Sequence, residues 1–202
     1  EEILSAAGID SRLLSAPVPT GTSAGAIRSE LAGELGLKES TQIVSISHDQ
    51  VAAAVGSGVF DETCAVDGAG TVECITPVFE TYDPMEMAAS GYAIVPYISP
   101  GKYVCYAFSF TGGALVDWYT KTLAGYAKQE AKMSGQDIHT ILETGYADAP
   151  TGLLVLPHFA GAATPYMDPG SKGAILGLSV ENTQQDIYLS CMEGVVYEMR
   201  LN

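Results

Sequence analysis

The sequence predicts a mixed fold, either α/β or α+β, and three observations predict it. Strand-like and helix-like patterns alternate along the 202 residues. Glycine (22 residues) and proline (10 residues) separate many short segments, as they do at turns. Hydrophobic residues make up 47% of the chain and charged residues 16%, which is typical of a globular protein with a sizeable core and excludes a disordered chain.

Helices are expected where apolar residues recur every three or four positions. Ile27, Leu31 and Leu35 have this spacing and Gly36 follows them, which predicts a short amphipathic helix that ends at the glycine. The last helix begins at Thr183, because residues 183–186 fit the capping-box pattern. Its expected buried face carries Ile187, Cys191, Val195 and Met199. A further helix is expected to start at 51–55. The longest expected helix covers 113–133, and another covers 137–144.

Strands are expected where β-branched and other apolar residues cluster. A hairpin is expected over 65–75, with a glycine-rich turn from Asp67 to Thr71 at its centre. Residues 153–156 are all apolar, which is typical of a buried strand. The remaining expected strands cover residues 41–47, 93–98 and 103–108.

The charge balance excludes several classes of function. With 9 basic and 24 acidic residues the net charge is −15, so the chain has no basic patch to neutralise a nucleic-acid backbone. The basic residues are scattered, and the longest apolar stretch, 152–163, is too short to span a membrane, so no membrane contact is expected. A nucleotide ligand is not excluded, because backbone N–H groups bind phosphate without Lys or Arg.

The four cysteines are expected to be reduced, buried thiols, because they are far apart and form no CxxC pair. No His and Cys cluster has the spacing of a metal site. The sequence begins with two glutamates and no basic leader, so a cytoplasmic protein is the default expectation. It has no initiator Met, which predicts a piece of a longer protein. The cysteines are Cys64, Cys74, Cys105 and Cys191.

The first candidate site covers residues 48–50, between an expected strand and an expected helix. Ligands of open α/β sheets bind at the carboxyl ends of strands. A carboxylate there, Asp49, can accept a proton from a substrate hydroxyl that attacks a phosphoryl group. The alternative is that Asp49 only caps the following helix.

Two glycine-rich segments are the other candidates. In segment 67–71 the glycines allow close approach of phosphate oxygens, and Thr71 offers a hydroxyl; the alternative is an ordinary tight turn. Segment 111–114 opens the helix expected over 113–133, and a helix N-terminus attracts anions; the alternative is a helix start packed closely against a neighbour. A serine hydrolase is disfavoured, because no His stands at a credible position for a catalytic triad.

The order of these segments resembles the FGGY family of carbohydrate kinases. In that family a Gly-Asp-Gln or Gly-Asp-Asn closes the last strand of the N-terminal domain, and His48-Asp49-Gln50 stands at this place. A Gly-Thr phosphate turn follows 21 residues after the aspartate in the xylulokinase-like pattern, and Gly70 lies 21 residues after Asp49. Segment 112–118 resembles the family's glycine-containing segment before a Trp-bearing helix. The family's C-terminal signature is resembled by segments 152–161, 164–169 and 172–178.

The resemblance implies an ATP- and Mg²⁺-dependent kinase that phosphorylates a sugar or polyol. The fold it implies is α/β, an actin-like, ribonuclease-H-like ATPase domain that is incomplete here. Residues 1–48 would end the N-terminal domain, and residues 49–202 would form most of the C-terminal domain, truncated before its adenosine-binding motif. A homodimer is common in the family.

The resemblance also implies roles for individual residues. Asp49 would be the general base, with His48 and Gln50 at the sugar. The nucleotide contacts would come from Gly70, Thr71, Gly113 and Asp117.

The sequence departs from the family pattern in ways that bear on its ligands. His48 stands where the family has Gly, and Asp117 where glycerol kinase has Gln. The family's Asp-x-Gly-Thr-Thr turn, whose Asp is involved with Mg²⁺, is absent from the 202 residues. The alternative function is therefore a catalytically incompetent binding or scaffold module of the same fold. An actin-like structural ATPase is disfavoured by segment 164–169, which resembles the sugar kinases.

Overall fold

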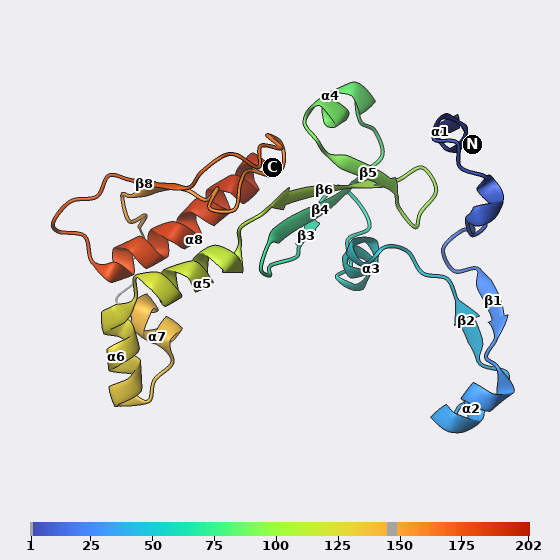
Figure 1. Cartoon of the computed structure of the whole chain (residues 1–202), viewed down its shortest axis with the longest axis horizontal. Coiled ribbons are helices and arrows are strands. Elements are labelled where there is room, and N and C mark those ends of the chain that lie inside the picture. The colour runs from blue at the N-terminus through green and yellow to red at the C-terminus, as the bar shows by residue number, and fades with distance from the viewer. Residues whose placement is uncertain (1, 145–148) are drawn as a thin grey trace. The chain divides into compact units, whose positions relative to one another are not determined.

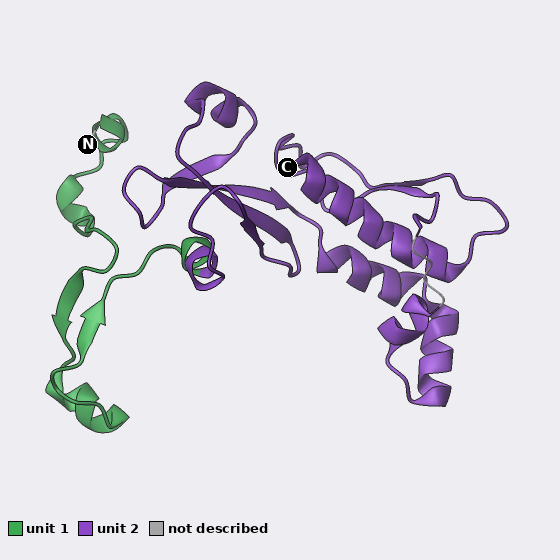
Figure 2. Ribbon diagram, turned by 180° about the vertical axis from the view of Figure 1, so that it is seen from behind, with its two compact units in different colours: residues 1–52 green, residues 53–202 purple. Residues whose placement is uncertain are grey.

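The computed structural model describes residues 2–144 and 149–202. They form two compact units, residues 1–52 and 53–202 (Figure 2). The division falls inside helix α3 (Asp49–Gly56), four residues after the boundary at 48 that the resemblance predicts. That boundary concerns the domains of a longer protein and stays a prediction.

The first unit consists of short elements around an antiparallel strand pair. Its strands pair Ser23 with Val44 and Ala26 with Gln42, and a bulge lies between Ser23 and Gly25. The strand predicted over 41–47 is shorter, because after Val44 only Ser45 continues the pairing with Thr22. The elements are α1 (Glu2–Ala6), the 3₁₀ helix η1 (Ser11–Leu13), β1 (Ser23–Ala26), α2 (Ser29–Leu35) and β2 (Gln42–Val44).

Helix α2 confirms the predicted helix and its stop. Gly36 has the left-handed conformation, with φ of 66°, and its N–H donates to carbonyl groups of the last turn. The predicted apolar face is only partly buried: Ile27 is buried, whereas Leu35 is 59% exposed and Ala32 is buried instead. The described residues of this unit therefore bury few large side chains.

The second unit contains an antiparallel four-stranded sheet with the order β3-β4-β6-β5 (Figure 1). Its outer pair β3–β4 is the predicted hairpin, in which Asp67 lies opposite Ile75. The predicted strands at 93–98 and 103–108 are also confirmed. Helix α4 was not predicted, although Asp83 caps it and Pro84 begins it, a recognisable helix start. The bounds are β3 (Ala65–Asp67), β4 (Glu73–Phe79), α4 (Pro84–Ala89), β5 (Ala93–Pro96) and β6 (Tyr103–Ser109).

The prediction of a single helix over 113–133 is wrong. The structure has two helices there, α5 (Gly113–Thr122) and α6 (Gly125–Ser134), because the chain leaves helical geometry at Ala124, with ψ of 41°. Gly125, which favours a break, begins the second helix. The predicted helix at 137–144 is confirmed as α7 (Ile138–Glu143), capped by Asp137.

The core of the second unit lies between α5, α7, the long helix α8 (Gln184–Leu201) and a second strand pair, β7 (Leu154–Leu156) and β8 (Ala174–Leu176). The predicted face of α8 is confirmed at Cys191 and Val195, which are buried. The strand predicted to be buried over 153–156 is buried only at alternate positions. Val155 packs in the core, whereas Leu154 is 55% exposed, because β7 has one covered face.

The cysteine prediction holds for three residues and is wrong for one. Within the described residues none of the four forms a disulfide, and Cys74, Cys105 and Cys191 are buried, but Cys64 is exposed. Burial raises the pKa of Cys105 and Cys191 to about 11. Over the described ranges 2–144 and 149–202, no helix combines the length and the hydropathy that crossing a membrane requires.

Replacing Thr183 with Ala is expected to destabilise the second unit by about 1 kcal/mol. The Thr183 hydroxyl accepts the Asp186 N–H, and the Asp186 carboxylate accepts the Thr183 N–H, so the substitution removes one half of the capping box at the start of α8. Chemical denaturation measures the loss. Thr183→Ser keeps the hydroxyl and is expected to retain most of the stability; equal losses for Ser and Ala would contradict the capping role.

Candidate functional site

Residues 48–50 form the start of α3. The carbonyl of His48 accepts the first helical hydrogen bond, from the Ala52 N–H at 2.9 Å, so His48 is the N-cap residue and Asp49 the first helical residue. The alternative that Asp49 is the cap is therefore wrong by one position. The Asp49 carboxylate lies 2.9 Å from His48 Nδ1 and accepts the Gln50 N–H at 2.8 Å, and its side chain is 83% exposed. An exposed carboxylate in this position is open to a substrate.

In the second unit, the glycine-rich turn and the start of α5 are joined. The Gly113 N–H donates to the Gly70 carbonyl at 2.7 Å, and the N–H groups of Gly112 and Ala114 both donate to the Thr71 carbonyl at 3.1 Å. A Cβ at Gly113 would lie 2.7 Å from the Gly70 oxygen, so only glycine permits this approach. The structure thus brings together two segments that the sequence predicted separately.

These bonds change the interpretation of segment 111–114. The first N–H groups of α5 are used by the carbonyl groups of the turn, and the Leu115 N–H donates to Gly112. These contacts favour the alternative, close packing against a neighbour, and the anion site at this helix start stays a prediction. The turn itself keeps its polar groups available, since Thr71 is exposed and its hydroxyl makes no hydrogen bond to any residue the structure describes.

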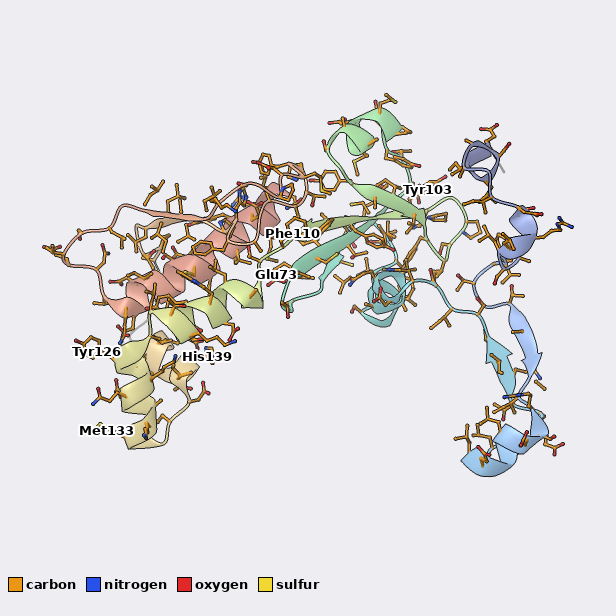
Figure 3. All side chains as sticks on the ribbon, viewed as in Figure 1. Glu73, Tyr103, Phe110, Tyr126, Met133 and His139 are labelled. Atoms are coloured by element: carbon orange, nitrogen blue, oxygen red, sulfur yellow. The ribbon has the colours of Figure 1, made fainter. Side chains whose placement is uncertain are left out.

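A groove of about 440 Å³ lies beside this junction. Its polar wall comes from the hairpin and the start of α5, and its apolar wall from α5 and α8. Asp67 and Glu73, from the two strands of the hairpin, are among the residues that line this groove (Figure 3 labels Glu73). The remaining lining residues are Ala69, Gly70, Gly112, Gly113, Val116, Met192, Val195, Val196 and Met199.

The predicted nucleotide residues differ in their relation to this groove. Gly70 and Gly113 line it, and Thr71 belongs to the same turn. Asp117 is not among the lining residues, and its carboxylate pairs with Lys121 one helical turn further on, at 2.5 Å. The assignment of Asp117 to the nucleotide stays a prediction.

Sequence reasoning missed Glu73. Its Oε2 atom is buried without a hydrogen-bond partner among the described residues. Burial first, and then the negative charge of Asp67, raises the pKa of Glu73 to about 7. The available signal was a charged residue at the beginning of a mostly apolar strand, two positions after Thr71.

A second polar cluster lies in the segment after β7. His158 is buried, and its Nε2 lies 3.1 Å from the buried Glu198 carboxylate of α8, while its Nδ1 lies 2.8 Å from Ser171 Oγ. Ser171 follows the turn at Asp168, to whose carbonyl its N–H donates. These contacts fix the segment against α8, so His158 fills the interior.

The sequence of the second unit identifies the family. Residues 69–202 match the model of the C-terminal domain of the FGGY family of carbohydrate kinases. This match covers well over half of the chain. The chain belongs to the FGGY family of carbohydrate kinases.

Curated relatives of this chain are sugar and polyol kinases. A xylulose kinase of Lactococcus lactis is 26% identical over 99% of the chain, and a ribulokinase of Anoxybacillus flavithermus is 27% identical over 95%. A glycerol kinase of Alteromonas mediterranea is 27% identical over 99%. The chain spans only 38%, 34% and 38% of these proteins, so it corresponds to a part of each.

Solved structures confirm the predicted fold class. A xylulose kinase from Brucella ovis aligns with 98% of the chain at a TM-score of 0.80 and 23% identity. A glycerol kinase from Plasmodium falciparum, solved with ADP, aligns with 98% at a TM-score of 0.76 and 20% identity. The chain covers 39% and 38% of these structures, so it has an incomplete actin-like, ribonuclease-H-like fold.

Proposed function

We propose that the protein to which this chain belongs transfers the terminal phosphoryl group of ATP to a hydroxyl of a sugar or polyol. One observation carries the proposal: the turn with Gly70 and Thr71 is fixed on α5 by three hydrogen bonds while the Thr71 hydroxyl stays available. Phosphoryl transfer depends mainly on positioning and charge stabilisation, and a rigid turn with an available hydroxyl and glycine backbone supplies positioning.

Asp49 is the general base of this proposal. Its carboxylate is exposed at the start of α3, where it can accept the proton of the attacking hydroxyl. His48 and Gln50 flank it, and His48 Nδ1 lies within 2.9 Å of the carboxylate, so these two side chains are the proposed sugar contacts.

The nucleotide is proposed to bind in the groove beside the turn. Gly70 and Thr71 would contact its phosphates, and Gly113 would allow the nucleotide to approach the start of α5. The apolar wall with Val116, Met192 and Val196 suits a flat, weakly polar group such as a nucleobase.

Mg²⁺ remains a prediction from the resemblance. Among residues 2–144 and 149–202, no group of three or more His, Cys, Asp or Glu side chains could hold a metal ion. No step of the proposal therefore depends on a metal ligand of this chain. The homodimer and the cytoplasmic location also stay predictions.

Thr71→Val in the complete protein is expected to weaken ADP binding about tenfold, because it removes a hydrogen bond to a charged group and keeps the branched shape. Isothermal titration with ADP measures the affinity. Thr140→Val, at an exposed position of α7, is the matched control and is expected to bind like the wild type. Equal affinity of Thr71→Val and wild type would contradict the role of the turn.

The alternative, a binding or scaffold module of the same fold, makes a different prediction. It expects nucleotide binding without sugar-dependent turnover, even for the complete protein. An ADP-release assay of the complete protein with a panel of ketopentoses and polyols separates the two functions.

A further inference from the structure

The candidate base lies at one end of a helix whose other end is closed by a glycine-dependent cap. Helix α3 runs without interruption from Asp49 to Gly56. Beyond it Gly58 has the left-handed conformation, with φ of 81°, and the Val59 N–H donates to the Ala54 carbonyl at 2.9 Å. This bond is typical of a Schellman cap, in which the residue after the glycine is tied to the last turn of the helix. A group that holds Val59 therefore also holds the end of α3.

Two side chains from the turn between β5 and β6 hold this segment. Tyr97 directly follows β5, and its hydroxyl donates to the Val59 carbonyl at 2.6 Å. Lys102 directly precedes β6, and its Nζ donates to the Phe60 carbonyl at 2.9 Å. The turn that carries both is itself closed, because the Tyr97 N–H donates to the Lys102 carbonyl at 2.9 Å. Two successive carbonyl groups after α3 are thus bound by two side chains of one turn.

Burial makes these bonds costly to lose. Tyr97 and Val59 are both buried, so removal of the hydroxyl would leave the Val59 carbonyl without a donor and poorly solvated. The Lys102 side chain is only 24% exposed, and its Nζ also lies 3.5 Å from a carboxylate oxygen of Glu80. The ammonium group is therefore held from two sides, and its bond to the Phe60 carbonyl is charge-assisted.

The anchor formed by Tyr97 and Lys102 is separate from the proposed nucleotide groove. Among the described residues that line the groove, none belongs to the anchor or to the segment 59–60 that it holds. An effect of the anchor on the reaction would therefore pass through α3, which carries Asp49. Position matters for such a group, because misplacement by about 1 Å can cost about 100-fold in rate.

We propose that Tyr97 and Lys102 are positioning residues, which hold the C-terminal end of α3 and so fix how the helix presents Asp49. The proposal rests on the proposed role of Asp49 as general base, and it assigns no chemical step to the anchor. Without the two bonds the segment after α3 is released, and the cap opens more often. The Asp49 carboxylate then samples more positions, and it meets the attacking hydroxyl in the productive one less often.

Steady-state kinetics of the complete protein test this role. Tyr97→Phe keeps the ring and removes only the hydroxyl, and Lys102→Met keeps the apolar stem and removes the ammonium group. Each variant is expected to lower kcat with saturating sugar by between about 10- and 100-fold. Each is expected to keep the ATP affinity of the wild type in titration calorimetry, because the groove is not changed.

Tyr126→Phe and Lys132→Met are the matched controls. They make the same chemical changes at exposed positions of α6 (Figure 3 labels Tyr126), and both are expected to keep the wild-type kcat. A wild-type kcat in both Tyr97→Phe and Lys102→Met would overturn the proposal. Loss of ATP affinity together with kcat would overturn it as well, since the anchor would then support the fold in general and not the position of one group.

Hydrogen exchange separates this proposal from the proposed function. The amides of Ala52, Ser57 and Val59 report the first turn of α3, its end and its cap. Their protection factors are expected to fall about tenfold in Tyr97→Phe, because a buried carbonyl loses its donor. The Leu123 amide at the end of α5 is the internal reference and is expected to stay constant.

If the wild-type protein shows no sugar-dependent turnover, the proposed function fails. The exchange data still decide whether the anchor holds α3. Constant protection of the three α3 amides in Tyr97→Phe would overturn the proposal, whatever the kinetics show.

Discussion

Asp49→Asn in the complete protein is expected to abolish sugar-dependent phosphoryl transfer and to leave ATP binding intact. The amide keeps the size of the carboxylate but cannot accept the proton of the attacking hydroxyl. General-base catalysis is worth about 10²- to 10⁴-fold, so kcat is expected to fall by that factor. The fold should not change, because the side chain is 83% exposed and the first hydrogen bond of α3 uses the His48 carbonyl.

The measurement is steady-state ADP release with a saturating sugar, together with ATP affinity from titration calorimetry. Glu34→Gln is the matched control, since Glu34 is an exposed carboxylate on α2, and it is expected to have wild-type kcat. A kcat near the wild-type value for Asp49→Asn would remove Asp49 from the mechanism. Loss of both ATP affinity and turnover would assign it a structural role instead.

The elements that sequence reasoning predicted correctly depend on local signals. Gly36 ends α2, and the capping box of Thr183 and Asp186 begins α8, because each device acts within one helical turn. The break between α5 and α6 was missed, although Gly125 marks it, since the apolar spacing continues across the glycine.

The candidate site was predictable in its parts and not in its assembly. Segments 67–71 and 111–114 each have a recognisable glycine pattern, but nothing local shows that the Gly70 carbonyl will accept the Gly113 N–H. That contact joins residues far apart in sequence, and it shows that the second segment packs closely against the first. Glu73 was missed for the same reason, because its confinement depends on Gly112.

Gly194→Ala is expected to destabilise the second unit by about 2 kcal/mol, even though alanine is the better helix former by about 1 kcal/mol. Gly194 lies inside α8, and a Cβ there would lie 2.6 Å from the Val155 carbonyl oxygen and 2.9 Å from the Val155 Cβ. The carbonyl oxygen is a backbone atom of β7, and the Cβ is attached directly to that backbone. A side-chain rotation therefore cannot relieve either contact. Helix and strand must separate, and Val155 is part of the core between them.

Urea denaturation of the 202-residue chain measures this loss, and Gly125→Ala is the matched control. A Cβ at Gly125 has nothing within 4 Å, so its only effect is improved helix propensity, and the variant is expected to be as stable as the wild type or more so. The loss at Gly194 should also reach the groove, because the same helix supplies Met192 and Val196 to its wall. ADP affinity is therefore expected to fall in Gly194→Ala and to stay constant in Gly125→Ala. An equal gain of stability in both variants would contradict the prediction. The close approach of α8 to β7 would then not determine the position of the α8 wall of the groove.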